Sequence, residues 1–103
     1  MDLEINFSRD EKGGKWETKD PQDESLIAYM SFIQAGPNKI IIDHTIVPKE
    51  FSMKGTGKAL LREAIAYMRD NDLKTMPTCS FVLSQLKKYQ EWHDVLDPSQ
   101  VPS

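Results

Sequence analysis

A short loop, residues 54–58 (Lys-Gly-Thr-Gly-Lys), joins a β-branched run to an amphipathic helix and most constrains how this chain can fold. The run before it, residues 40–47, reads Ile-Ile-Ile-Asp-His-Thr-Ile-Val and is typical of a strand. After the loop, apolar residues recur at helical spacing as far as Arg69. Glycine lets a backbone turn tightly and approach a ligand, and the first turn of a helix presents unpaired N–H groups. The junction therefore predicts a phosphate-binding site on a strand–loop–helix unit.

The rest of the chain divides into short elements of both kinds. The residue patterns predict strands over 3–7, 16–18, 25–34, 40–47 and 73–82, and helices over 55–69 and 83–96, the second broken near Gln90. The run 25–34 is apolar on both faces, which predicts a central strand covered on both sides. The expected order is β-β-β-β-α-β-α, an α+β (α/β-like) domain whose one parallel crossover carries the glycine loop. The tail 97–103 is expected to fray.

The length and charge of the chain exclude several classes of protein. A chain of 103 residues fits one domain, 1–103, and its net charge of −3 argues against a general nucleic-acid coat. No stretch reaches the roughly 20 apolar residues that span a bilayer, and the first residues lack the features of a signal peptide. Cys79 is the single cysteine, which excludes an intrachain disulfide and leads us to expect a reducing cytoplasm. The two histidines and the cysteine have no metal-ligand spacing, so no metal is expected.

The glycine loop does not match the two best-known phosphate-binding patterns. A Walker A loop needs glycine where Ser52 stands and a magnesium-binding hydroxyl where Ala59 stands. A dinucleotide fingerprint would place its third glycine at Leu60. A purely structural alternative stays open, in which the glycines only allow close packing of the helix against the sheet.

Three pieces in order give the chain a more specific resemblance. They are Asp-His-Thr-Ile-Val-Pro at 43–48, Gly-Thr-Gly-Lys-Ala-Leu at 55–60, and Pro-Thr-Cys-Ser-Phe-Val at 77–82 followed by Lys-Lys-Tyr at 87–89. Together they resemble the small, single-domain branch of the GCN5-related N-acetyltransferase (GNAT) superfamily over residues 26–96. The resemblance implies a GNAT-type mixed sheet, mostly antiparallel with one parallel crossover and flanked by helices.

The resemblance also implies acetyl-coenzyme A as the co-substrate and an unidentified amine as the acceptor. It places the pyrophosphate on backbone N–H groups of the loop and the thioester at the end of the preceding strand, where backbone donors would polarise its carbonyl. The residues so implied for coenzyme binding are Ile46, Val47, Met53, Lys54, Gly55, Thr56, Gly57, Lys58 and Tyr89. Ser52 stands where the superfamily usually has Arg or Gln, so only the backbone of the loop is expected to contribute there. Larger members carry extra elements around the acceptor, which implies an open site here.

His44 and Cys79 are the candidate catalytic residues. An imidazole can take the proton of the attacking amine, and a thiolate can carry the acetyl group through a two-step route. Strand alternation puts His44 on one face with Ile40, Ile42 and Ile46, and the implied fold puts its strand beside the strand of Cys79. A buried histidine bonded to the backbone and a cysteine that acts as a small hydrophobe are the plain alternatives.

Three functions remain open from the sequence. The first is an acetyl-CoA-dependent N-acetyltransferase, with Cys79 as nucleophile, acid or wall of the site. The second is a non-catalytic acyl-CoA-binding module, a sensor or interaction domain. The third is a small interaction domain without a ligand, in which the glycine loop is purely structural. Tyr89 either approaches the coenzyme or only packs, and Lys87 and Lys88 either bind its 3′-phosphate or lie on a solvated helix face.

Overall fold

A five-stranded sheet crossed by one long helix is the framework of the computed structural model, which describes residues 4–52 and 55–102. The strands are β1 (Ile5–Arg9), β2 (Gly13–Asp20), β3 (Asp23–Gly36), β4 (Lys39–Ile46) and β5 (Lys74–Thr75). The helices are α1 (Lys49–Ser52), α2 (Thr56–Asp70) and α3 (Ser80–Lys88), followed by the 3-10 helices η1 (Gln90–Val95) and η2 (Pro98–Gln100).

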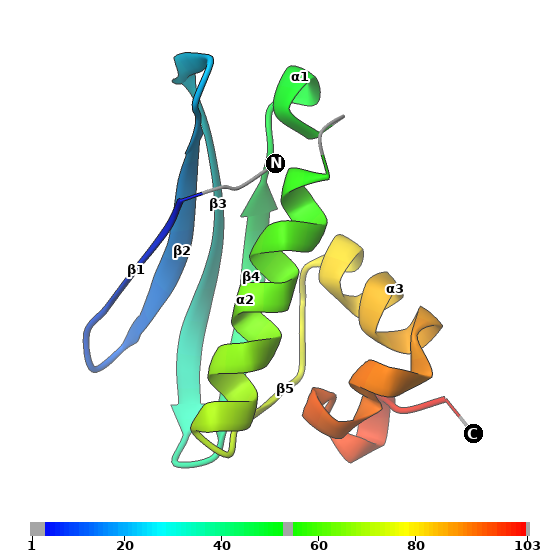
Figure 1. Ribbon diagram of the computed structural model, residues 1–103. Helices are drawn as coiled ribbons and strands as arrows, with labels where there is room; N and C mark the ends of the chain where they lie inside the picture. The colour runs from blue at the N-terminus through cyan, green and yellow to red at the C-terminus, as the bar shows by residue number, and fades with distance from the viewer. Residues whose placement is uncertain (1–3, 53–54, 103) are drawn as a thin grey trace.

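The strands follow one another across the sheet in chain order, from β1 to β5 (Figure 1). The first four pair antiparallel, as strands joined by short turns do, and β4 pairs with β5 in parallel. A parallel pair needs a crossover, and α2 supplies it. The prediction of a mostly antiparallel sheet with one parallel crossover behind the glycine loop is confirmed.

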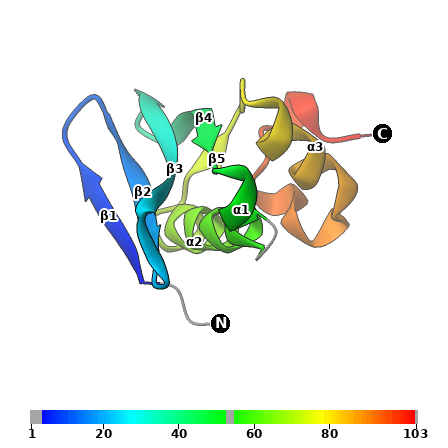
Figure 2. The same cartoon turned by 90° about the horizontal axis from the view of Figure 1, so that it is seen from above.

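The core lies between α2 and one face of the sheet (Figure 2). The apolar stripe of α2 packs there because its residues recur every three or four positions. The buried apolar residues of this layer are Trp16, Ala28, Met30, Phe32, Ile40 and Ile42 from the sheet and Leu60, Leu61, Ala64, Ile65 and Met68 from α2. The start of α2 is thereby fixed against the end of β4.

The other face of the sheet is uncovered in the described part of the chain, so the prediction that the long strand is covered on both sides is wrong. In β3, Ala28 and Met30 are fully buried, whereas Ile27 and Ile33 keep 40% and 48% of their surface exposed. β3 is central in strand order, but α2 lies on one face only (Figure 2). The apolar residues on both faces of this run therefore correctly predicted a central strand, but not a second layer of structure over the sheet.

The fifth strand is much shorter than the predicted 73–82. β5 has 2 residues, and α3 already begins at Ser80. Pro77 lacks an N–H group and cannot continue a hydrogen-bonded ladder. The backbone beyond it still follows β4, because the N–H of Cys79 donates to the carbonyl of Ile42 at 3.3 Å. Cys79 therefore lies at the N-terminus of a helix and not within a strand.

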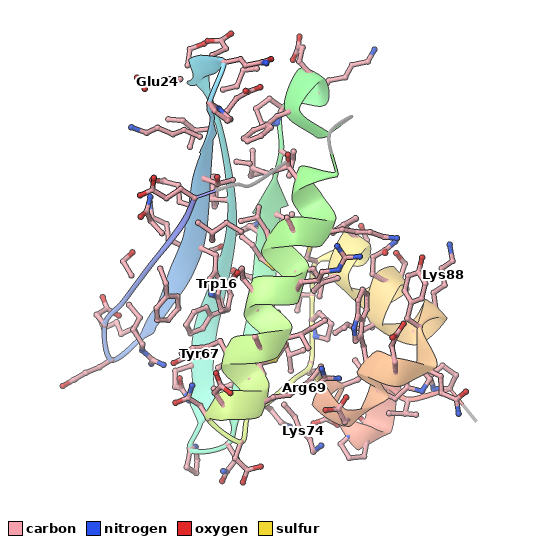
Figure 3. The ribbon with its side chains drawn as sticks, in the orientation of Figure 1. Trp16, Glu24, Tyr67, Arg69, Lys74 and Lys88 are labelled. Carbon is pink, nitrogen blue, oxygen red and sulfur yellow. The ribbon has the colours of Figure 1, made fainter. Side chains whose placement is uncertain are left out.

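The predicted break in the last helix is confirmed, since α3 ends at Lys88 and η1 begins at Gln90. Arg69 at the end of α2 fixes η1 by donating to both carboxylate oxygens of Asp94 at 2.9 Å. This bidentate hydrogen bond lowers the pKa of Asp94. Lys74 of β5 also donates to the backbone carbonyl of Asp94, and Arg69 and Lys74 both lie beside η1 in Figure 3.

The C-terminal tail, which we expected to fray, is attached to the sheet. Leu96 forms a parallel bridge with Thr75, and the N–H of Asp97 donates to the Thr75 carbonyl at 2.8 Å. The Asp97 carboxylate pairs with Lys39 at 2.7 Å and accepts hydrogen bonds from the N–H and hydroxyl of Ser99. These contacts, with the Lys39 ammonium as the largest cause, hold the pKa of Asp97 far below its ordinary value.

Replacing Asp97 with Asn is expected to lower the melting midpoint at neutral pH by a few degrees, because Asn keeps the bonds to Ser99 but loses the charge that faces Lys39. A carboxylate with a lowered folded-state pKa stabilises the fold fully above its unfolded pKa of about 3.9, and this contribution is lost as the pH falls through the folded-state value. The loss of melting midpoint in D97N should therefore shrink below about pH 4, as followed by circular dichroism melts.

Asp23→Asn is the matched control, because Asp23 accepts the same pair of bonds from Ser25 on the exposed surface. A D97N deficit that stays constant down to about pH 2 would contradict the assignment.

None of the helices in the described residues is long and apolar enough to span a membrane.

Candidate functional site

A pocket of about 420 Å³ lies where the end of β4 and the starts of α2 and α3 meet (Figure 1). It is lined by Thr45, Val47, Gly55, Gly57, Lys58 and Phe81. The lining is mainly apolar, with a hydroxyl and an ammonium group as its polar side-chain groups. A concave, mostly apolar site with a few polar groups is typical of ligand-binding pockets.

Two glycines shape the α2 side of this pocket for different reasons. Gly55 precedes the helix with φ of 78°, a left-handed conformation that most residues adopt only under strain. Gly57 lies in the first turn, where a Cβ would come within 3.1 Å of the Phe81 ring. Glycine at this position therefore keeps α3 close and leaves the pocket wall without a side chain.

The start of α2 presents backbone donors to the pocket. The first intrahelical bond runs from the N–H of Ala59 to the carbonyl of Gly55 at 3.1 Å, so the N–H groups of the preceding turn have no intrahelical acceptor. No acidic residue stands in the first turn, and the helix dipole is positive here. The Thr56 side chain is fully buried and donates to the carbonyl of Phe51 at 2.8 Å, which ties α1 to α2. Thr56 can therefore contribute its backbone to an anion, but not its hydroxyl.

Lys58 links the pocket to α3. Its ammonium donates to the hydroxyl of Tyr89 at 3.0 Å and lies 4.8 Å from the centre of that ring. The hydrogen bond from Lys58 is the main reason why the pKa of Tyr89 is lowered. The ammonium of Lys88 also lies over the Tyr89 ring, at 5.4 Å. Two cations thus gather at Tyr89, between the start of α2 and the end of α3.

A β-bulge in β4 decides which side chains reach the pocket. Ser31 of β3 pairs with His44, but its neighbour Phe32 pairs with Ile42, so Asp43 is an extra residue without a partner of its own. An extra residue shifts the alternation of the strand by one position. Residues after the bulge therefore face the opposite way from what simple alternation gives.

The prediction that His44 shares a face with Ile40, Ile42 and Ile46 is accordingly wrong for Ile40 and Ile42, and only Ile46 lies with it on the outer face. Ile40 and Ile42 are fully buried against α2, whereas Ile46 is 49% exposed. The side chain of His44 is 67% exposed, with Nε2 3.8 Å from Oδ2 of Asp43. The histidine is neither buried in the core nor part of the pocket lining.

Thr45 takes the inward position that alternation assigned to His44. It pairs with Met30, which is fully buried on the α2 side, and it lines the pocket. The thiol of Cys79 donates to the Thr45 hydroxyl with Sγ and Oγ1 3.3 Å apart. The segment of Cys79 does lie beside β4, as expected, but the structure brings its thiol to Thr45, whereas His44 lies on the outer face. The catalytic roles of His44 and Cys79 stay predictions.

One edge of β4 is open beside the pocket. β5 pairs with β4 only at Lys39 and Ile40, and the backbone bonds from the following segment end at the carbonyl of Ile42. In the described ranges no further backbone bond joins the two segments beyond that carbonyl. On this edge, opposite β3, the β4 backbone from Asp43 to Ile46 has no backbone partner among the described residues, so its peptide groups are open to an extended ligand.

The remaining predicted coenzyme contacts divide into three groups. Val47 lines the pocket, whereas the side chain of Ile46 faces away and only its backbone is at the strand edge. Met53 and Lys54 lie outside the described residues.

Among the residues that are described, no group of three or more His, Cys, Asp or Glu side chains could hold a metal ion.

Sequence reasoning missed Thr45 and Phe81 as pocket residues. Phe81 falls in the predicted strand 73–82, and the signal against a strand there is Pro77, after which a helix can begin. Thr45 has no such signal, because a bulge without glycine leaves no mark in the hydrophobic pattern.

The chain is similar to a known protein family and to a solved structure. A family model described as GCN5-related N-acetyl-transferase matches residues 15–95. Among solved structures, the chain is similar to the solution NMR structure of a GCN5-like candidate N-acetyltransferase from Staphylococcus aureus, with 32% identity and a TM-score of 0.69 over 89% of this chain and 87% of the other. No curated protein matched the chain significantly. The matched residues run from β2 to the end of η1 and include every element around the pocket.

Proposed function

This chain belongs to the GCN5-related N-acetyltransferase family, and we propose that it binds acetyl-coenzyme A in the pocket at the start of α2 and transfers the acetyl group to an amine. The observation that carries the proposal is the position of the pocket. It lies between helix N–H groups that suit phosphate and an open strand edge that suits an extended chain of amides.

The chemistry of the pocket fits the parts of the coenzyme in order. The pyrophosphate binds at the first turn of α2, where Gly55 and Gly57 leave the backbone accessible. The amides of the pantetheine arm pair with the open edge of β4, which directs the thioester toward Thr45 and Val47. The ammonium groups of Lys58 and Lys88 at Tyr89 suit the 3′-phosphate of the coenzyme.

The thiol of Cys79 lies beside this proposed thioester position, because it donates a hydrogen bond to Thr45. In the proposed first step the Cys79 thiol gives its proton to solvent water, a bond forms between Sγ and the acetyl carbon, and the bond from that carbon to the coenzyme sulfur breaks. The coenzyme leaves as a thiolate that takes up a proton from solvent. A neutral amine then attacks the acetyl carbon, the amide forms, and Cys79 leaves as a thiolate. The amine proton passes to solvent, or to His44 when the amine approaches from the outer face.

Acetyl-CoA is expected to raise the melting midpoint of the protein. A ligand that binds only the folded state stabilises it by about 2.7 kcal/mol at a hundredfold excess over its dissociation constant. Differential scanning fluorimetry with millimolar acetyl-CoA measures the shift, and equimolar free acetate is the control. No shift with acetyl-CoA would end the proposal, whereas a shift without any acetyl transfer would favour the non-catalytic binding module.

Incubation with acetyl-CoA alone is expected to leave an acetyl group on Cys79, detected by mass spectrometry after an acid quench. Cys79→Ala should show no such adduct and should release coenzyme thiol at least tenfold more slowly, because it removes the nucleophile. His44→Ala should acetylate Cys79 at no less than about a third of the wild-type rate, since the exposed imidazole faces away from the pocket. Equal thiol release by wild type and C79A would remove Cys79 from the mechanism.

A further inference from the structure

Thr45 connects the pocket to the thiol. Its side chain lines the pocket, and its Oγ1 lies 3.3 Å from Sγ of Cys79, within hydrogen-bond range for sulfur. The two residues are 34 positions apart in sequence, so only the folded chain brings them together. The bulge at Asp43 turns Thr45 inward, and without it the side chain of His44 would take this place.

We infer that Thr45 is the positioning residue for Cys79, holding its sulfur at the pocket and donating a hydrogen bond to it when it attacks the thioester. The inference rests on the proposed function, because it assigns Thr45 a part in the same acetyl transfer. The Thr45 hydroxyl contacts the reacting sulfur through a hydrogen bond, but it does not act as the base that removes the thiol proton.

A hydroxyl suits this task because it can reverse the direction of its hydrogen bond. It accepts from the thiol, as it does in the structure, and after the thiol proton has passed to solvent water it rotates and donates to the thiolate. A hydrogen bond to a charged partner is about twice as strong as one between neutral groups. The Thr45 hydroxyl can therefore hold the sulfur both before and after the thiol proton leaves, and the thiolate is the form that attacks the thioester.

The position of Cys79 in the fold leaves its sulfur available for this bond. Cys79 is the N-cap of α3, yet its side chain makes no capping hydrogen bond to the helix backbone. The thiol donates instead to Thr45, so the sulfur is held at the pocket and not at the helix end.

Thr45→Val and Thr45→Ser form the matched pair that tests the inference. Valine keeps the shape and the β-branch but removes the hydroxyl, and serine keeps the hydroxyl. The first readout is the rate at which iodoacetamide alkylates Cys79, which is unambiguous because the chain has 1 cysteine. We expect T45V to react about fivefold more slowly than wild type at neutral pH and T45S to react within about twofold of it.

The second readout is the rate of Cys79 acetylation against acetyl-CoA concentration. T45V should lower the maximal rate and leave the half-saturating concentration unchanged, and T45S should restore the rate. Alkylation of T45V at the wild-type rate would overturn the inference. A change in the half-saturating concentration alone would also overturn it, because that is the effect expected of a residue that only forms the pocket wall. If T45V does not fold, Thr45→Ala against T45S makes the same comparison. Failure of wild type to bind acetyl-CoA would overturn the proposed function, whereas the alkylation rates would still decide whether Thr45 controls the thiol.

Discussion

Gly57→Glu is expected to weaken acetyl-CoA binding at least a hundredfold. The Cβ of the new side chain would lie 3.1 Å from the Phe81 ring, and the side chain places a carboxylate at the proposed phosphate position. Like charges about 4 Å apart repel by about 4 kcal/mol at a partly exposed site, which corresponds to a loss of at least a hundredfold in affinity. Isothermal titration calorimetry measures the loss directly.

The fold itself is expected to survive this substitution. A carboxylate in the first turn of a helix interacts favourably with the dipole of α2, so the helix has no electrostatic reason to open. Ala66→Glu is the matched control, because Ala66 is an exposed residue of the same helix outside the pocket lining. A66E should bind acetyl-CoA within about twofold of wild type, since it lies about 13 Å along the helix from Gly57, which is more than the Debye length of about 8–10 Å. Binding of wild-type strength by G57E would mean that the phosphate lies elsewhere.

Trp16→Ala is expected to lower the free energy of unfolding by about 3–5 kcal/mol. Trp16 is only 2% exposed, and its ring lies 5.0 Å from that of Phe32, 5.4 Å from that of Phe7 and 5.8 Å from that of Tyr67. Figure 3 places Trp16 and Tyr67 between β2 and α2, so the indole fills the layer that fixes α2 on the sheet. Because small domains have only about 5–15 kcal/mol of stability, this loss takes much of the margin.

Urea unfolding followed by circular dichroism measures this change. Trp92→Ala is the control, because Trp92 is only partly buried and contacts Tyr89 at 5.0 Å outside the α2 layer. Its expected cost is about 1–2 kcal/mol. Trp16→Phe should recover part of the loss. A smaller loss in W16A than in W92A would mean that the core does not depend on the indole.

The order of the elements could be predicted from the sequence because it follows from local patterns. The β-branched run before the glycine loop and the helical stripe after it correspond to β4 and α2, and Gly55 and Gly57 do lie at their junction. The prediction failed where two local patterns look alike. A short apolar run such as Ser-Phe-Val at 80–82 suits a strand or a helix, and in the structure it forms the first turn of α3.

The sequence by itself determined the family, the parallel crossover and the glycines that open the start of α2, because these depend on residue type and spacing. Only the tertiary structure decided which side chain meets Cys79. The pairing of β3 with β4 inserts Asp43 as an extra residue, and an insertion of one residue exchanges the two faces of a strand. His44 therefore lies outside and Thr45 lies against the thiol. Register is a property of two paired strands, so no pattern within one of them could contain it.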